Sequence, residues 1–448
     1  MTNSARLSGR PSSSAAYNVG DVVDTPDSAI KSWRYLGAGE WEPNDAVRYT
    51  TGPGGVVRNS NGLAVGELGV GSVIYAQRQH AGYLPANGAV YSIAAYRALR
   101  ATIGTVPDGA GTWTARTSAL DNVWNGVCWS PELSLFCAVA NSGTGNRVMT
   151  SPDGITWTAR TSALDNWWRA VCWSPELSLF CAVSSSGAGN RVMTSPDGIN
   201  WTVRTSAADN SWLSVCWSPE LSLFCAVAAT GTGNRVMTSP NGITWTARTS
   251  AEDNSWLSVC WSPELSLFCA VSATGVGNRV MTSPDGINWT ARTSASDNNW
   301  YGVCWSPELS LFCAVAASGV GNRVMTSNDG ITWTARASAA DNQWYGVCWS
   351  PELSLFCAVA YSGTGNRVMT SPDGITWTTR TSAADNQWYV VCWSPELSLF
   401  CAVSTDGAGN RVMTNAPAAT YNPRTHFKLP TLPNATSGEA RAFIYAGA

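Results

Sequence analysis

The sequence predicts an all-β fold, a seven-bladed β-propeller, from three observations. The phrase CWSPELSLFCAV occurs seven times, and successive copies, such as those at Cys128 and Cys172, begin 44 residues apart. Each copy contains four short apolar stretches separated by Pro, Gly, Asn, Asp and Ser. The array also starts and stops partway through a repeat. A period in the forties is typical of stacked copies of one supersecondary unit, so the architecture follows from the repeat.

The four stretches of the first complete repeat predict four antiparallel strands. They cover residues 124–129, 135–140, 146–150 and 155–161. Connections as short as those between them suit hairpins and cannot form parallel crossovers. No apolar stripe with a helical period of 3.6 occurs in the repeat, which excludes an α-solenoid. Four such strands fill one blade of a propeller.

The ends of the array predict that the ring closes. The array opens with the fourth-strand phrase GTWTART at 111–117 and ends with the third-strand phrase NRVMT at 410–414. The last blade must therefore take its outer strand from the beginning of the array. Such a clasp removes two free sheet edges.

The composition indicates a soluble protein that binds neither nucleic acid nor membranes. The net charge is −3 and 13% of the residues are charged, which leaves no basic surface for nucleic acid. Residues 1–17 are polar and rich in Ser, and no apolar run of roughly 18 residues occurs. We therefore expect synthesis in a cytoplasm, with no signal peptide and no membrane insertion.

All 14 cysteines lie in the repeats. If the hairpin turns at 131–134, Cys128 lies opposite Cys137, at a cross-strand distance of about 4.5–5.5 Å that permits a disulfide. Two interpretations stay open: reduced packing residues, or seven cross-strand disulfides. No zinc or other metal site and no cofactor are expected, because the ligand spacing is wrong and both histidines, His80 and His426, lie outside the repeats.

The turn SPDGITW at 151–157 resembles the Asp-box of sialidase-like propellers, although one residue is missing before the glycine. The resemblance implies a structural turn, in which the Asp accepts backbone hydrogen bonds and the Trp packs into the blade. Sialidase catalysis needs arginines and acids that are unique in the chain, whereas residues such as Arg147 and Arg160 recur in every blade. We therefore predict no catalytic residues and no enzyme.

The flanks resemble a phage tail-collar domain. The phrases GSVIY at 71–75 and GYLPANG at 82–88, followed by a helix predicted over 92–104, resemble its first part. The phrase FKLPTL at 427–432 resembles its next element, although the family's glycine-rich segment is absent. The resemblance implies that the propeller is inserted into a small α+β collar-like domain.

Three regions follow from these observations. Residues 1–70 are expected to form an N-terminal arm and a small β module that attaches to the virion and to other tail proteins. Residues 71–110 and 415–448 form the split collar-like domain, and residues 111–414 form the propeller. Tail-collar relatives imply a homotrimer.

The seven copies differ mainly on one face of the predicted propeller. The first-to-second turns, SPELS in every copy, lie with the third-to-fourth turns on what we call the lower face. The other two connections, on the upper face, carry most of the differences. These fall beside a shared Asp-Asn pair, at the two residues after a shared Trp, and in the second-to-third loop. Recognition of a receptor and neutral drift of surface loops both remain possible explanations.

The upper-face residues combine aromatic surfaces with hydrogen-bonding groups, a combination suited to carbohydrate. The shared tryptophans could line this face or pack between blades. The candidate receptor-binding residues are Trp124, Asn125, Asn141, Trp167, Trp168, Arg169, Trp212, Trp256, Trp300, Tyr301, Trp344, Tyr345, Tyr361, Trp388 and Tyr389.

The sequence thus predicts a receptor-binding protein of a phage tail fibre or tail tip, located in the virion tail after synthesis in the host cytoplasm. Its partner would be a host cell-surface receptor, either a glycan or a protein. The upper face would point away from the collar-like domain, because the chain enters and leaves the propeller at the lower face. The alternatives are an Asp-box glycan hydrolase acting as a depolymerase, and a structural tail decoration protein.

Overall fold

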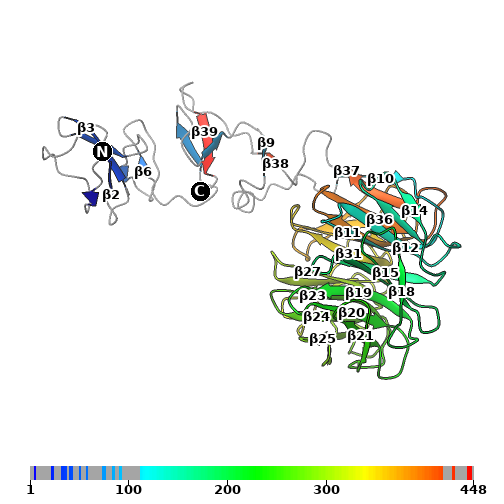
Figure 1. The fold of residues 1–448 in the computed structure, drawn as a ribbon. Helices are drawn as coiled ribbons and strands as arrows, with labels where there is room; N and C mark the ends of the chain where they lie inside the picture. Colours follow the sequence, from blue (N-terminus) through cyan, green and yellow to red (C-terminus); the bar gives the residue numbers. More distant parts are fainter. Residues whose placement is uncertain are drawn as a thin grey trace. The chain divides into compact units, whose positions relative to one another are not determined.

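The computed structural model describes residues 111–416 and, beyond them, only the backbone of short strands. Residues 111–416 form seven four-stranded antiparallel sheets, the blades of a propeller (Figure 1). Their first strands contact one another in cyclic order, and the last contacts the first. The all-β seven-bladed propeller predicted from the repeat is confirmed.

Each blade runs from its first strand at the centre to its fourth strand at the rim, and blades are numbered 1 to 7 along the chain. The first strands are β11 (Trp124–Ser130), β15 (Trp168–Ser174), β19 (Trp212–Ser218), β23 (Trp256–Ser262), β27 (Trp300–Ser306), β31 (Trp344–Ser350) and β35 (Trp388–Ser394). The second strands are β12 (Leu135–Ala140), β16 (Leu179–Ser184), β20 (Leu223–Ala228), β24 (Leu267–Ser272), β28 (Leu311–Ala316), β32 (Leu355–Ala360) and β36 (Leu399–Ser404). The third strands are β13 (Val148–Ser151), β17 (Val192–Ser195), β21 (Val236–Ser239), β25 (Val280–Ser283), β29 (Val324–Ser327), β33 (Val368–Ser371) and β37 (Val412–Ala416). The fourth strands are β14 (Thr158–Arg160), β18 (Thr202–Arg204), β22 (Thr246–Arg248), β26 (Thr290–Arg292), β30 (Thr334–Arg336), β34 (Thr378–Arg380) and, for blade 7, β10 (Thr112–Arg116).

The fourth strand is shorter than predicted because a side chain holds the residues before it in a turn. The carboxylate of Asp153 accepts hydrogen bonds from the backbone N–H groups of Ile155 and Thr156, at 2.8 and 2.7 Å. The indole of Trp157 donates to the carbonyl of Gly154 at 3.2 Å. These residues are therefore committed to the turn, and the strand begins only at Thr158.

The clasp closes the ring as predicted. Strand β10 pairs antiparallel with β37, from Thr112 opposite Ala416 to Arg116 opposite Val412. Figure 1 shows the two strands side by side, β10 in cyan and β37 in orange. Arg116 Nε donates to Thr414 Oγ1 at 2.8 Å, which reproduces the bond between the fourth and third strands of the other blades.

Each blade is joined to the next by a hydrogen bond at the lower face. Trp217 Nε1 donates to Glu176 Oε2 of the SPELS turn in the preceding blade, at 2.6 Å. The same contact recurs around the ring, and Trp129 and Glu396 make it between blades 1 and 7. The invariance of SPELS therefore has a structural cause.

The core lies between the blades. Phe224, Met237 and Trp212 of blade 3 pack against Cys181 and Val183 of blade 2. Equivalent clusters fill the other interfaces. Burial of apolar side chains at each interface makes every blade dependent on its neighbours.

The predicted cysteine register is correct. Cys128 lies opposite Cys137, and the same pairing recurs in the other six blades. All fourteen thiols are free in the structure. Burial raises the pKa of the Cys137 thiol far above its ordinary value.

The flanks form a second compact unit, Met1–Pro107 with Thr425–Ala448. Its strands are β1 (Ala5–Arg6), β2 (Val22–Asp24), β3 (Ser32–Gly37), β4 (Glu40–Pro43), β5 (Thr50–Thr51), β6 (Val57–Arg58), β7 (Val73–Ala76), β8 (Tyr83–Pro85), β9 (Val90–Ser92), β38 (His426–Lys428) and β39 (Arg441–Tyr445). Strand β39 pairs with β7 and β8, and β38 pairs with β9, so segments from both ends of the chain share sheets.

The α+β character expected of this unit stays a prediction, because all but Ser92 of the helix predicted over 92–104 lies outside the described residues. Within the part of the chain that is described, no helix has the length and apolar character needed to cross a membrane.

Candidate binding cavity

A β-bulge at the top of every first strand fixes where the variable residues point. In blade 1, Trp124 pairs with Ala140 and Gly126 pairs with Val139, so Asn125 is an extra residue. The same shift occurs in all seven blades. Bulges often occur next to functional sites, where they redirect a side chain. The seven bulge residues are Asn125, Arg169, Leu213, Leu257, Tyr301, Tyr345 and Tyr389.

These bulge residues line a single cavity of about 700 Å³. The residue that follows each of them lines it as well, so all seven blades contribute. Upper-face connections of blades 1, 6 and 7 also contribute to the wall, with Val123, Asn141, Tyr361, Gln387 and Thr405. Five of the shared valines also line it: Val127, Val171, Val215, Val303 and Val347. The two variable residues after each shared Trp therefore meet in one place, whereas most of the variable residues beside the Asp-Asn pair and in the second-to-third loop lie outside the cavity.

The shared tryptophans do not belong to this cavity, and their assignment as candidate binding residues was wrong. Trp124, Trp168, Trp212, Trp256, Trp300, Trp344 and Trp388 are all 0% exposed. Each indole N–H donates to the backbone carbonyl four residues earlier, at 2.9 to 3.1 Å. With their rings packed between blades and their only polar atom satisfied, they cannot contact a receptor.

Four tyrosines form an aromatic wall on one side of the cavity. Tyr301 and Tyr345 stack with ring centroids 4.0 Å apart and planes 7° apart. Tyr361, from the loop between β32 and β33, stacks on Tyr345 at 4.8 Å. Tyr389 meets the edge of Tyr345 at 5.3 Å. The three neighbouring bulge tyrosines that the sequence selected do lie together, and Tyr361 joins them.

Arg169 reaches this wall from blade 2. Its Nη2 donates to the hydroxyl of Tyr389 at 2.8 Å, and its guanidinium carbon lies 5.5 Å from the centre of the Tyr389 ring. Burial, partly opposed by Arg169, raises the pKa of Tyr389. Burial and the neighbouring phenols raise the pKa of Tyr345 well above its ordinary range. Both phenols are therefore neutral and able to donate hydrogen bonds at physiological pH.

Of the remaining candidate residues, two line the cavity and one does not. Asn125 and Asn141 line the cavity, and Asn125 Nδ2 donates to the carbonyl of Val123 at 2.9 Å. Trp167 is 56% exposed and does not line it. Leu213 and Leu257, which are not among the candidate residues predicted from the sequence, do line it. Their place at the same repeat position as the tyrosines was the signal that could have identified them.

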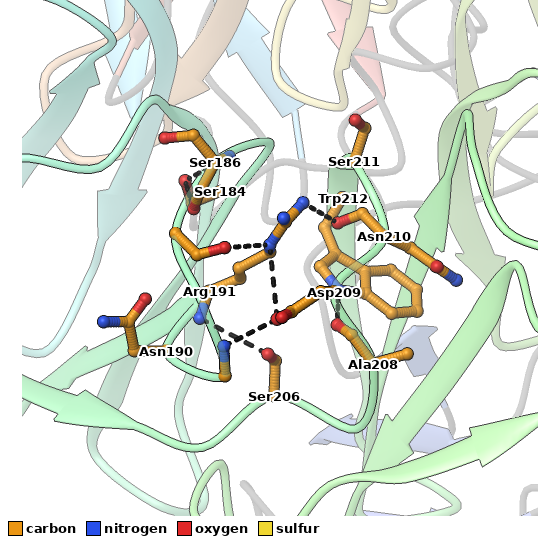
Figure 2. Close-up of polar contacts among 12 residues, drawn as sticks. Ser184, Ser186, Asn190, Arg191, Ser206, Ala208, Asp209, Asn210, Ser211 and Trp212 are labelled. Atoms are coloured by element: carbon orange, nitrogen blue, oxygen red, sulfur yellow. Dashed lines mark hydrogen bonds and ion pairs between the residues drawn. The ribbon is translucent and has the colours of Figure 1, made fainter.

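Invariant residues hold the variable ones in place, as Figure 2 shows for blades 2 and 3. Arg191 Nε donates to Gly187 O, and its Nη1 donates to the carbonyls of Ser185 and Asn210, at 2.9 to 3.0 Å. Asp209 lies 3.5 Å from this guanidinium and accepts a hydrogen bond from the N–H of Gly189.

The arginine–aspartate ion pair of Figure 2 recurs at every blade junction, including Arg411 with Asp121 between blades 7 and 1. The upper-face loops are thus held in position by arginine and aspartate side chains that are present in every repeat. Among the described residues, no cluster of three or more His, Cys, Asp or Glu could hold a metal ion.

Comparisons with known proteins support the fold. No protein-family model matches the chain, and no curated protein matches it. A streptogramin B lyase structure is similar with a TM-score of 0.57 and 7% identity, over 67% of this chain and 96% of that chain. A GH74 enzyme of Niastella koreensis is similar with a TM-score of 0.54 and 13% identity, over 68% of this chain and 53% of that chain. The propeller domain of Myceliophteria thermophila Cps50 (Swd1) is similar with a TM-score of 0.50 and 11% identity, over 66% of this chain and 97% of that chain. Because these proteins differ in function and share little sequence, the likeness shows that the chain has a β-propeller fold and nothing further.

Proposed function

We propose that the chain is a receptor-binding protein of a phage tail fibre or tail tip, and that the upper-face cavity binds a glycan of the host surface. One observation carries the binding proposal: in all seven nearly identical copies, the two variable residues that follow the shared Trp line the same cavity. Exposed loop positions outside the cavity vary too, such as those of Val276 and Val320. Drift of exposed loops nevertheless gives no reason for the differences at the buried and half-buried positions that face the cavity.

The chemistry of the lining supports a saccharide ligand. Tyr301 and its aromatic neighbours offer flat apolar surfaces, while Asn141, Gln387 and Thr405 offer amide and hydroxyl groups. The volume falls in the range of roughly 300–1,000 Å³ that is usual for ligand pockets. The framework of invariant arginines and aspartates would hold these groups in place before the ligand binds, which lowers the entropic cost of binding.

The phage assignment rests on the flanks. Residues 71–110 and 415–448 carry the collar-like phrases, and strands from both segments pair with one another. In this proposal residues 1–70 attach the chain to other tail proteins, and the chain assembles as a homotrimer in the virion.

Binding accounts for the cavity better than glycan hydrolysis does. Most glycoside hydrolases use two carboxylates at the scissile bond, and the described residues that line the cavity include no Asp or Glu. A purely structural tail protein would leave the convergence of the variable residues without a cause.

The test compares two triple variants of the full chain. Tyr301→Ala, Tyr345→Ala and Tyr389→Ala together should abolish binding to a panel of bacterial cells and bacterial surface glycans, since the loss of one aromatic anchor costs about 1–3 kcal/mol. The control, Thr158→Ala, Thr202→Ala and Thr246→Ala, changes exposed residues of the outer strands. It should bind like the unmodified chain. Equal binding by both variants would contradict the proposal.

A further inference from the structure

The charge on the cavity wall bears on which chemical class of saccharide the cavity would bind. Among the described residues that line the cavity, Arg169 is the only one that carries a charge. The chain as a whole has a net charge of −3. A positive charge in the cavity is therefore a local feature and does not reflect the overall composition.

Arg169 differs from the other arginines of the repeats. The arginines of the Arg191 type each lie 3.5 to 3.7 Å from an aspartate and donate to carbonyls. Those of the Arg160 type donate to a threonine on the adjacent strand. Arg169 has no carboxylate partner within residues 111–416, and its hydrogen bond to Tyr389 engages one of five guanidinium N–H groups.

The surroundings of Arg169 hold its guanidinium at the cavity wall without neutralising it. The Tyr389 hydroxyl accepts from Nη2, and the Tyr389 ring lies beside the guanidinium. Because the phenols of Tyr345 and Tyr389 are neutral, they supply no counter-charge. A half-buried cation of this kind favours an anion, and a guanidinium suits oxyanions in particular because it can donate two parallel hydrogen bonds.

We propose that the cavity binds an acidic saccharide, with its carboxylate or other oxyanion paired to Arg169 and its rings against the tyrosine wall. This inference rests on the proposed function and narrows it to one chemical class. The Leu213 and Leu257 side chains, next to Arg169 in the order of the blades, would contact apolar parts of the same ligand.

The test uses the full chain and an array of bacterial saccharides that pairs acidic glycans with their carboxyl-reduced or dephosphorylated neutral forms. We expect the acidic members to bind, with an affinity that falls as salt is raised. Arg169→Leu should weaken their binding by about tenfold or more, while leaving any binding of neutral members unchanged. Leucine is the natural residue at this position in blades 3 and 4, so the variant should fold. Arg160→Gln, which removes a positive charge from the outer strand β14, should bind like the unmodified chain.

The outcomes separate the two proposals. Binding of neutral glycans alone, or of acidic glycans with no effect of Arg169→Leu, would overturn the inference about acidic ligands and leave the receptor-binding proposal standing. No binding to any saccharide, together with unaltered adsorption of the tyrosine triple variant to cells, would overturn both.

Discussion

Three tryptophan positions are shared by every complete repeat, and none of the three faces the cavity. The tryptophan that opens the first strand, such as Trp212, packs between blades, while Trp217 donates to a lower-face glutamate and Trp201 closes a turn. The arginines also differ in role. Arg191 and Arg204 donate hydrogen bonds that hold the framework, and among the described residues Arg169 is the one arginine that lines the cavity. A tryptophan or an arginine that is present in every copy therefore has a structural role.

The lower-face glutamates should therefore matter for stability. Glu176→Ala removes the acceptor of the Trp217 indole, and we expect it to lower the free energy of unfolding by about 1 kcal/mol. The control is Glu252→Ala, because this exposed glutamate occupies a position where other blades carry Ala. Thermal unfolding of both variants checks the prediction, and equal melting temperatures would contradict it.

The thiols should be unreactive towards thiol reagents in the native protein. Burial raises the pKa of thiols such as Cys137 and Cys181, and only the thiolate reacts readily. We expect titration with a thiol reagent to be slow in the native state and to reach 14 groups per chain after denaturation without reductant. A value near zero in the denatured protein would mean that the cross-strand pairs are disulfides.

The element that the sequence could not reveal is the bulge in each first strand. Alternation of apolar residues predicted a strand from Trp124 onwards, and the structure has one there. An extra residue in one strand changes register without changing composition, so the inward direction of Asn125 or Tyr301 was not predictable from the pattern. The second-to-third loop was predicted to lie on the same face, and Tyr361 from that loop does stack on a bulge tyrosine.

The third-to-fourth turns should make stability fall in acid. Burial acts to raise the pKa of Asp197, but hydrogen bonds from Asn200 and its neighbours outweigh it and set the pKa at about 2. The pKa of Asp285 is also about 2 for the same reasons. Since an unfolded Asp titrates near pH 3.9, these turns stabilise the fold fully above that pH, and their contribution is lost as pH falls from about 4 to 2.

Blade 3 supplies the control for this effect, because its Asn241 accepts the same two backbone hydrogen bonds at 2.9 Å and cannot titrate. A variant with Asn at the equivalent positions Asp153, Asp197, Asp285, Asp329 and Asp373 should lose less stability between pH 4 and 2 than the unmodified chain. Urea unfolding at a series of pH values measures the free energy of unfolding of both proteins. An equal loss of this free energy between pH 4 and 2 in the two proteins would contradict the prediction.

The whole ring was predictable from the sequence because the partial repeats at its two ends are complementary. The cavity was predictable only in part. Comparison of the copies located Arg169, Tyr301, Tyr345 and Tyr389, but a tryptophan shared by all copies gives the same sequence signal whether it packs or faces solvent. Burial resolves that ambiguity, and only the three-dimensional structure supplies it.

Closure of the ring should be required for stability. Replacement of Thr112–Arg116 by a Gly-Ser segment of equal length removes β10 and exposes an edge of β37. We expect a lower melting temperature and a tendency to associate. The same replacement of Thr246–Arg248 in β22, which leaves the ring closed, should have a smaller effect. Light scattering and thermal unfolding distinguish the outcomes, and an unchanged monomer after loss of β10 would contradict the clasp.

The central claim is that the cavity where the variable residues meet is the site of glycan binding. The most direct measurement is an experimental structure of the full chain in complex with a saccharide that it binds in the array. The account predicts density for the sugar inside the cavity, against Tyr345 and within hydrogen-bonding distance of Arg169. Density over the SPELS turns of the lower face, with the cavity empty, would contradict it.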